Sequence, residues 1–305
     1  MNEPKIYIVT PVYFDVKSFL RLRTDTTICI RSCEAVSNLL FKFIVVDDSA
    51  GSDVEVLDLD VLPDVEVLAM PVNSGHQKAI VYALRSLSTK LNDNDFIITM
   101  DADGEDLPVD VSKLITSVLN HSEPQSPIAI AQRIGREESV KFRILYFFFK
   151  TFFKIMTGSK IKSGNFALQR GRIIKQTINH PSFDLCYSTT LFALNKNIVW
   201  VPCKRGQRFE GSSKMNTYSL VAHGIRMLLP LWEKISVRML GWTAALIAIA
   251  LSLSAFLITM IYFFGRDFGS IFLIPITLFM TGLTTLFSAV SLFAIFSQSK
   301  IYQNF

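Results

Sequence analysis

Charged residues are scarce in this chain: they make up 19% of its 305 residues, and the mean hydropathy is +0.35. Ordinary soluble domains contain about 25% charged residues. Cysteine is also rare, with four residues and no Cys-x-x-Cys pair. These shortages exclude a disordered chain, a disulfide-stapled scaffold and a nucleic-acid-binding tail, and they favour a membrane protein with reduced thiols.

Two further motifs are missing. The sequence contains no GxGxxG and no Walker A loop, so a bound diphosphate would need a cation rather than a glycine-rich backbone cradle. The first residues do not resemble a signal peptide, because the start is polar and the apolar run at 6–12 is too short. We therefore expect no cleaved leader.

Two long charge-free runs lie near the C-terminal end, at residues 239–264 and 268–299. About 20 apolar residues span a bilayer as a helix, so each run is long enough. We predict two transmembrane helices, 239–264 and 270–297, joined by a short polar turn. The alternative is a buried apolar hairpin of a soluble protein, which two runs of this length disfavour.

The charges predict the orientation of this hairpin. All but two of the 31 Lys and Arg residues precede residue 239, and Lys234, Arg238 and Lys300 flank the two runs. By the positive-inside rule, the large N-terminal part and the C-terminus face the cytoplasm. The net charge of +5 is assigned to lipid headgroups and phosphorylated substrates, with no nucleic-acid partner.

The N-terminal part alternates between strand and helix patterns. Apolar runs that read as strands occupy residues 6–10, 41–46, 65–68, 96–100 and 128–131. Helical patterns are predicted from the first of these strands to about residue 40, and over 76–91 and 109–120. Apolar strands alternating with helices predict an α/β fold with a parallel sheet covered by helices.

Acidic residues follow three of these strands, and ligands bind at the carboxyl ends of strands in such sheets. Asp101, Asp103, Glu105 and Asp106 place four carboxylates within six residues. Unpaired carboxylates repel each other and raise each other's pKa values, which a divalent cation relieves. Mg²⁺ or Mn²⁺ fits these hard oxygen ligands. A solvated acidic turn is the alternative.

Other candidates are less specific. Asp47 and Asp48 could bind a ribose or a base, or simply begin a helix. His76 could donate to a phosphate, or face solvent in the first turn of a helix. The basic loop 205–214 could hold a phosphate, or be an ordinary juxtamembrane loop. The aromatic and basic segments 141–154 and 216–235 favour helices at the membrane interface over core helices.

Six motifs in order carry a family resemblance. They are Pro-x-Tyr at 11–13, Val-Asp-Asp-Ser at 46–49, Asn-x-Gly-His-Gln-x-Ala at 73–79, Met-Asp-Ala-Asp-x-x-Asp-x-Pro at 100–108, Ser-Gly-x-Phe at 163–166 and Arg-Phe-x-Gly-x-Ser-Lys at 208–214. With the two-span tail, the chain resembles the family 2 glycosyltransferases. The similarity is closest to polyprenyl-phosphate sugar transferases, which include dolichol-phosphate mannose synthases and bacterial undecaprenyl-phosphate glucosyltransferases of O-antigen modification.

The resemblance implies a GT-A fold, a Rossmann-like nucleotide-sugar-binding α/β domain, and assigns roles to residues. Asp101, Asp103 and Glu105 would bind the metal, although Glu105 stands where the family commonly has Gln. Asp103, Arg208 and Lys214 would be catalytic. The acceptor phosphate would contact Arg133, Arg143, Ser213 and Lys214. The residues implied for the donor nucleotide are Pro11, Tyr13, Asp15, Asp47, Asp48, Asn73, His76, Lys78 and Asp101.

The implied reaction is inverting, metal-dependent transfer of a hexose from a nucleotide sugar to polyprenyl phosphate. UDP-glucose is the first choice of donor, and UDP-galactose, a UDP-N-acetylhexosamine and GDP-mannose stay open. A non-catalytic membrane adaptor with a transferase-like domain is the competing reading. A processive polysaccharide synthase would need a Gln-x-x-Arg-Trp motif, which Gln207, Arg208 and Phe209 do not supply.

The expected organisation has three parts: a cytosolic GT-A domain at 1–215, a juxtamembrane amphipathic helix at 216–237 and the two spans within 238–299. The resemblance implies a multi-pass protein of the bacterial cytoplasmic membrane. Its relatives of this shape include tetramers, so a homo-tetramer is compatible with the pattern.

Overall fold

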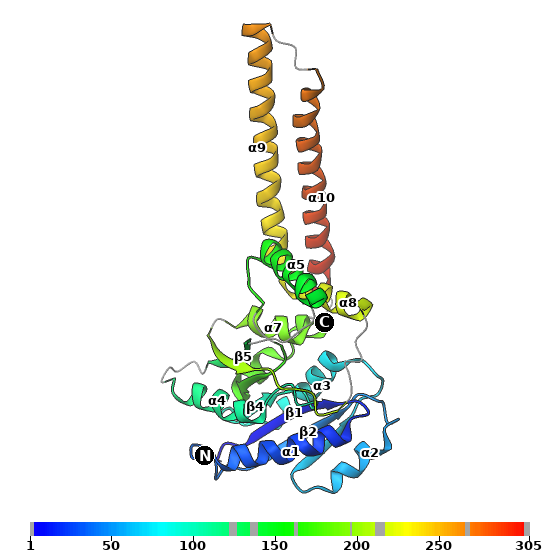
Figure 1. Cartoon of the computed structure of the whole chain (residues 1–305), viewed down its shortest axis with the longest axis vertical. Coiled ribbons are helices and arrows are strands. Elements are labelled where there is room, and N and C mark those ends of the chain that lie inside the picture. The colour runs from blue at the N-terminus through cyan, green and yellow to red at the C-terminus, as the bar shows by residue number, and fades with distance from the viewer. Residues whose placement is uncertain are drawn as a thin grey trace. The chain divides into compact units, whose positions relative to one another are not determined.

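A computed structural model of the chain describes residues 3–121, 127–134, 140–161, 164–195, 197–210, 217–265 and 269–301. It divides into two compact units. Unit 1 comprises Met1–Arg143 and Lys162–Pro230, and unit 2 comprises Ile144–Ile161 and Leu231–Phe305. Each unit is described by itself (Figure 1).

Unit 1 is built on a sheet whose described strands follow the order β3-β2-β1-β4-β6-β5-β7. These strands are β1 (Ile6–Val12), β2 (Phe41–Asp47), β3 (Val65–Ala69), β4 (Phe96–Thr99), β5 (Ile128–Ile134), β6 (Ala167–Arg170) and β7 (Ile198–Lys204). The five strands predicted from the sequence are all present. Strands β6 and β7 were not predicted.

The sheet is mixed rather than purely parallel, which corrects the sequence-based expectation. Strand β6 runs antiparallel to both β4 and β5, while β1, β2, β3 and β4 pair in parallel. The short sequence Ala-Leu-Gln-Arg of β6 ends in two polar residues, so its apolar signal is weak. Its reversed direction brings the start of β6 to the edge where β4 ends.

Helices cover both faces of the sheet in unit 1. They are α1 (Val16–Arg31), α2 (Val54–Leu57), α3 (His76–Ser88), α4 (Pro108–Leu119), α6 (Gly171–Thr177) and α7 (Tyr187–Leu194). Helix α8 (Thr217–Leu228) contacts α7, and the 3-10 turns of this unit are Asp58–Val61, Pro181–Asp184 and Leu229–Leu231. Helix α1 ends at Arg31 rather than near residue 40. The Arg31 guanidinium donates to the Leu39 carbonyl at 3.3 Å and closes the turn that follows.

Successive side chains along each strand are buried on opposite faces of the sheet, in two separate hydrophobic cores. Ile8 of β1 and Phe43 of β2 are fully buried with residues of α1 and α4 on one face. Val9 and Ile44, one residue further along each strand, are buried with α3, α6 and α7 on the other. This period-two alternation of two apolar faces explains why the strands read as continuous apolar runs.

Unit 2 contains α9 (Trp232–Phe264), the 3-10 turn η4 (Gly269–Phe272) and α10 (Leu273–Ile301), together with most of α5 (Val140–Thr157). Helices α9 and α10 pack side by side (Figure 1). Thr243 and Thr285 share a hydrogen bond of 2.8 Å between the two helices, and Trp232 meets Phe293 edge-on. Gly282 lets α10 approach Ile247, since a Cβ there would lie 3.0 Å from its side chain.

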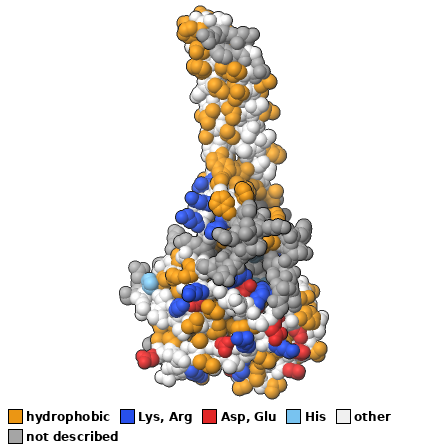
Figure 2. Space-filling model, in the orientation of Figure 1, with side chains coloured by type: hydrophobic (Ala, Val, Ile, Leu, Met, Phe, Trp, Pro, Cys, Tyr) orange, Lys and Arg blue, Asp and Glu red, His pale blue; other side chains and the backbone are white. Residues whose placement is uncertain are grey.

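The outer surface of the α9–α10 pair is apolar. In Figure 2 its visible face is mostly hydrophobic, and exposed residues include Phe256, Tyr262 and Phe287. By length and composition, the stretches Leu220–Phe264 and Leu273–Ile295 could each cross a membrane. The predicted span 239–264 lies within α9, and the predicted span 270–297 lies within η4 and α10, while the helices themselves extend beyond these bounds.

Candidate functional site

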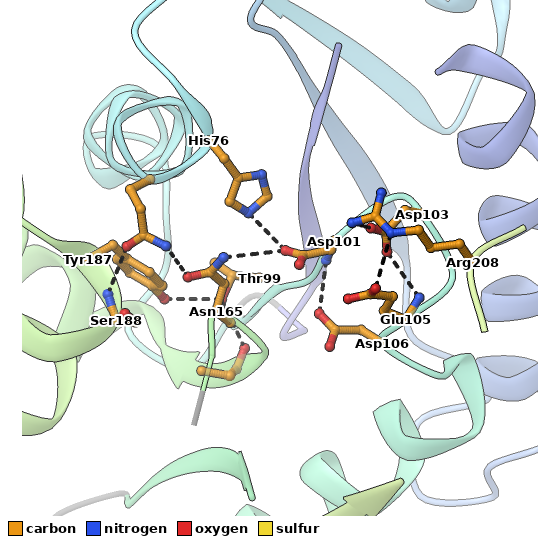
Figure 3. A network of polar contacts seen from close by, with 12 residues as sticks. His76, Thr99, Asp101, Asp103, Glu105, Asp106, Asn165, Tyr187, Ser188 and Arg208 are labelled. Carbon is orange, nitrogen blue, oxygen red and sulfur yellow. Dashed lines mark hydrogen bonds and ion pairs between the residues drawn. The ribbon is translucent and has the colours of Figure 1, made fainter. Parts of the chain in front are cut away.

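The polar residues that follow the strands gather at one edge of the sheet in unit 1. Asp101 and Asp103 follow β4, Arg133 lies near the end of β5, and Arg205 follows β7. Asn165 immediately precedes the reversed strand β6, so it reaches the same edge. Asp101 contacts both α3 and the start of β6 (Figure 3). The carboxyl edge predicted from the sequence is therefore the location of a dense polar cluster.

The acidic loop, residues 101–106, is folded by its own carboxylates. The Glu105 backbone N–H donates to Asp103 Oδ1 at 3.0 Å, and the Asp101 N–H donates to Asp106 Oδ2 at 3.0 Å. Gly104 adopts φ +86, a left-handed conformation that glycine accepts without strain. The loop is thus a compact turn that carries four carboxylates.

Three arginines surround the acidic loop. Arg133, only 14% exposed, pairs with Asp106 at 3.0 Å and lies 3.9 Å from Asp101. Arg208 pairs with Asp103 at 2.8 Å and with Glu105 at 3.1 Å, and Arg205 also pairs with Glu105. Because both Glu105 oxygens are engaged by arginines, Glu105 anchors the basic segment that follows β7.

That basic segment, residues 205–209, also pairs with the acidic loop through its backbone. The Phe209 N–H donates to the Asp103 carbonyl at 2.8 Å, and the Gly206 N–H donates to the Glu105 carbonyl at 2.9 Å. The Phe209 ring covers Gly104, and the Arg21 guanidinium lies 4.3 Å from the centre of that ring. The acidic loop and the basic segment therefore form one packed structure.

Gly104→Ala should push the acidic loop and the basic segment apart. A Cβ at Gly104 would lie 2.7 Å from the Phe209 ring, in addition to the backbone strain. Gly51→Ala is the matched control, because Gly51 has φ +79 but no atom within 4 Å of its Cβ position. We expect the Gly104 variant to lose roughly 1–3 kcal/mol more stability than the control, as in overpacked sites. Equal unfolding midpoints for the two variants would show that Phe209 does not pack there.

His76 forms an ion pair with Asp101, with Nε2 2.8 Å from Oδ1. Burial lowers the pKa of His76, but the charge of Asp101 and its hydrogen bond outweigh this and raise it overall. Burial raises the pKa of Asp101, whereas His76, Arg133 and Asn165 lower it by more, so Asp101 stays ionised. The Asp101 carboxylate therefore favours the protonated form of His76.

Asp103 and Asp106 have raised pKa values. Burial and the charge of Asp101 raise the pKa of Asp103, against the opposing effect of Arg208. The same two causes raise the pKa of Asp106 to about 7, although Arg133 opposes them. Burial is the first cause of both shifts, so the ionised forms of Asp103 and Asp106 are disfavoured although arginines lie beside them, and a divalent cation bound there would favour the ionised forms.

The Asp106 pKa predicts a pH dependence of stability. An unfolded Asp has a pKa of about 3.9. Between that value and about 7 the folded protein keeps a proton that the unfolded chain has released, so this stabilisation is lost as the pH rises. Between pH 5 and pH 8 the unfolding midpoint should fall more steeply in the wild type than in Asp106→Asn. His76 changes in the same direction in both proteins, so parallel curves would contradict the assignment to Asp106.

Asp47 and Asp48 organise loops at the end of β2. Asp47 is fully buried, and its carboxylate accepts the backbone N–H groups of Ser49 at 2.8 Å and Gly51 at 3.0 Å. Asp48 Oδ1 accepts the N–H groups of Ser74 and Gly75, just before α3. Asp48 therefore fixes the loop from which His76 reaches Asp101.

The other residues that the sequence predicts to bind the donor or the acceptor differ in their exposure to solvent. Pro11 is buried in β1, Tyr13 is 42% exposed with its ring against Phe14, and Asp15 precedes α1. Asn73 and Lys78 are exposed on either side of the start of α3. Ser213, Lys214 and the Arg143 side chain lie outside the described residues.

The sequence analysis included Arg205 only as part of the basic loop 205–214, and it missed two site residues, Gln77 and Asn165. Gln77 donates to Asn165 Oδ1, and Asn165 donates to Asp101 Oδ1 at 3.4 Å. Gln77 stands in the motif at 73–79, and Asn165 is the variable position of Ser-Gly-x-Phe at 163–166. Their place within motifs was the available signal. Among the described residues, no group of three or more His, Cys, Asp or Glu side chains forms a ready metal site.

The mixed α/β sheet of unit 1 is Rossmann-like, a class of fold in which ligands bind beyond the carboxyl ends of the strands, where the acidic loop lies. The sequence matches the family model of glycosyl transferase family 2 over residues 8–178. This match covers more than half of the chain, and the chain belongs to glycosyl transferase family 2. The comparison with curated proteins finds no match.

Solved structures give a more distant similarity. Glucosyl-3-phosphoglycerate synthase from Mycobacterium tuberculosis, in complex with Mn²⁺, UDP and glucosyl-3-phosphoglycerate, is 14% identical with a TM-score of 0.48, over 76% of this chain and 80% of that chain. A mannosyltransferase from Pyrobaculum calidifontis, in complex with GDP-Man and Mn²⁺, is 14% identical with a TM-score of 0.43, over 95% and 87%. At these values no residue role is transferred from either protein.

Proposed function

We propose that this glycosyltransferase moves a hexose from a nucleotide sugar, with UDP-glucose as the first choice, to a polyprenyl phosphate in the membrane. The observation that carries the proposal is the joint presence of the acidic loop at the carboxyl edge and two apolar membrane-length helices in one chain. A donor with a diphosphate needs the first feature, and an acceptor with a lipid chain explains the second.

The acidic loop fits a divalent cation held jointly with the donor. Asp101 and Asp103 provide hard carboxylate ligands, and Mg²⁺ sites commonly use one or two carboxylates together with substrate phosphates. Burial and the charge of Asp101 raise the pKa of Asp103, and a cation bound there would oppose both by stabilising the ionised form. Glu105 completes the proposed ligand set, provided that Arg205 and Arg208 release it. Mg²⁺ or Mn²⁺ bound there would neutralise the charge that develops on the leaving nucleoside diphosphate.

The protein's own residues would then bring two anions together. A phosphate monoester has a second pKa near 6, so the lipid phosphate is mostly dianionic at pH 7 and needs little help from a base. Arg208 pairs with Asp103, and 31% of its side chain is exposed, so a phosphate group has access to it. We assign Arg133, Arg143, Arg208, Ser213 and Lys214 to phosphate binding and orientation. Inversion at the anomeric carbon would give a β-linked product from an α-linked donor.

The donor nucleoside is assigned to the loops at the ends of β1 and β2. Tyr13 exposes an aromatic face there, and Asp15, Asn73 and Lys78 add exposed or half-exposed polar groups. Asp47 and Asp48 would support this region through the backbone turns that they hold. Pro11 ends the strand that leads into it.

Unit 2 is proposed to anchor the enzyme in the bacterial cytoplasmic membrane. Lys234 and Arg238 are exposed at the start of α9, and Arg238 donates to the Ile155 carbonyl of α5 at 3.1 Å. Helix α5 exposes Phe147, Phe148 and Phe152, which suits a position at the headgroup level. The domain ranges 1–215, 216–237 and 238–299, with the first part in the cytoplasm, complete the proposal.

A transfer assay in detergent tests the reaction. The purified full chain would receive undecaprenyl phosphate, Mg²⁺ or Mn²⁺ and one labelled nucleotide sugar at a time. We expect label from one donor to enter the lipid phase, and EDTA to stop it. Metal-dependent nucleotide binding without transfer would point to another acceptor. Absence of both nucleotide binding and transfer by the folded protein would favour the non-catalytic adaptor.

A further inference from the structure

A chain of hydrogen bonds runs from helix α7 to Asp101. The Ser188 backbone N–H, in the first turn of α7, donates to Gln77 Oε1 at 3.1 Å. Gln77 Nε2 donates to Asn165 Oδ1, and Asn165 Nδ2 donates to Asp101 Oδ1 at 3.4 Å. The labelled residues Ser188, Asn165 and Asp101 lie in this order in Figure 3. Three separate elements of the fold therefore connect to one carboxylate.

The direction of this chain is fixed by its first link. A backbone N–H can only donate, so the Gln77 carbonyl oxygen must face Ser188. The Gln77 amino group then faces Asn165 and donates to its oxygen, which turns the Asn165 amino group toward Asp101. The Cys186 thiol at 3.7 Å from Gln77 Oε1 reinforces the same orientation. Each amide thus presents a donor toward Asp101.

The backbone of Asn165 is held independently of this chain. Thr99 Oγ1 donates to the Asn165 carbonyl at 2.6 Å, and the Tyr187 hydroxyl lies 3.1 Å from the same Thr99 oxygen. Gln169 donates to Tyr187 at 2.9 Å. Asn165 is therefore fixed by its backbone as well as by its side chain, which makes it a rigid support.

We infer that Gln77 and Asn165 are positioning residues that hold the Asp101 carboxylate in the orientation the donor's cation requires. Asn165 and His76 both engage Oδ1, which fixes the rotamer and directs Oδ2 toward the side of Arg133. Partners of metal-binding carboxylates act in this way, and their loss typically lowers metal affinity about 10- to 100-fold. The inference rests on the proposed role of Asp101 in metal binding.

Gln77→Glu is the sharpest variant, because it keeps the size and the acceptor for Ser188 but removes the donor to Asn165. The Asn165 amide should then reverse and present its oxygen to Asp101, which displaces the carboxylate. Gln77→Met removes the donor without adding charge and should have a smaller effect. Asn195→Asp is the control: it makes the same amide-to-acid change at the C-terminal end of α7, where Asn195 contacts only the Leu191 carbonyl in the bonds described.

The experiment measures Mn²⁺ affinity of the full chain by electron paramagnetic resonance with UDP present, together with structures of the metal-free variants. We expect the Mn²⁺ dissociation constant to rise about 10- to 100-fold in Gln77→Glu, less in Gln77→Met and not in Asn195→Asp. Unchanged Mn²⁺ affinity, or an unmoved Asp101 in the Gln77→Glu structure, overturns the inference. If the wild type binds no Mn²⁺, the proposed function fails, while the position of Asp101 in the metal-free structures still decides whether the two amides orient it.

Discussion

Asp103→Ala is expected to reduce sugar transfer roughly 1000-fold, which corresponds to about 4 kcal/mol of lost transition-state stabilisation. Asp103 is one of the three carboxylates proposed to hold the cation, with Asp101 and Glu105, and its pKa is raised by burial and by Asp101. Without the Asp103 carboxylate, the cation that neutralises the departing nucleoside diphosphate is no longer held. The substitution also removes the Asp103 side-chain contacts with the Glu105 N–H and Arg208, whereas the hydrogen bond from Phe209 to the Asp103 backbone carbonyl remains, so the fold of the variant is checked by its unfolding midpoint.

The measurement is the initial rate of label transfer from nucleotide sugar to lipid phosphate, with Mn²⁺ affinity determined on the same samples. Asp184→Ala is the matched control, since Asp184 also pairs with an arginine, Arg85, at 2.7 Å in unit 1. This control should transfer sugar at close to the wild-type rate. Near-normal turnover by Asp103→Ala would contradict the proposed role of the acidic loop in sugar transfer.

Arg133→Met is expected to cause the largest loss of stability among the site variants, about 3 kcal/mol. Arg133 is 14% exposed and pairs with Asp106, whose side chain is 2% exposed, and it also lies near Asp101 and Glu105. Without Arg133, the buried Asp106 carboxyl must either stay ionised in a poorly solvated place or take up a proton, and Asp101 and Glu105 lose a nearby cation. For a domain of this size the unfolding midpoint should fall by roughly 6–12 °C.

A second substitution separates charge from packing. Arg133→Met combined with Asp106→Asn leaves no ionised Asp106, so part of the lost stability should return. Arg85→Met is the control, because its partner Asp184 is 48% exposed and surface pairs contribute at most about 1 kcal/mol. A wild-type midpoint for Arg133→Met, or a double variant less stable than the single one, would show that the buried pair does not stabilise the domain.

The sequence predicted much of the fold because its signals are local. Strands β1, β2, β3, β4 and β5 correspond to the predicted apolar runs, and the two charge-free runs give rise to most of α9 and α10. The prediction failed where the signal was weak or non-local. Strand β6 is four residues long and half polar, and its antiparallel direction depends on pairing with β4 and β5 rather than on its own composition.

The candidate site divides in the same way. The acidic residues at the ends of β2 and β4 were predictable, since parallel strands place their carboxyl ends at one edge. The residues that hold them were not: Asn165 lies 64 positions from Asp101, and Arg205 lies 100 positions from Glu105. Nothing in the sequence assigns these partners, because only the strand order β4-β6-β5-β7 makes them neighbours.

The sequence by itself determined the kind of chemistry and the kind of environment. Four carboxylates within six residues require cations, and two long charge-free runs require apolar surroundings, whatever the fold. The tertiary structure decided which basic side chains lie next to the carboxylates and how each carboxylate is oriented. Arg133, Arg208 and His76 come from separate elements, and only the fold brings them next to the acidic loop. Arg133 is 14% exposed, so water screens its charge least, whereas Arg208 and His76 keep 31% and 37% of their side chains exposed.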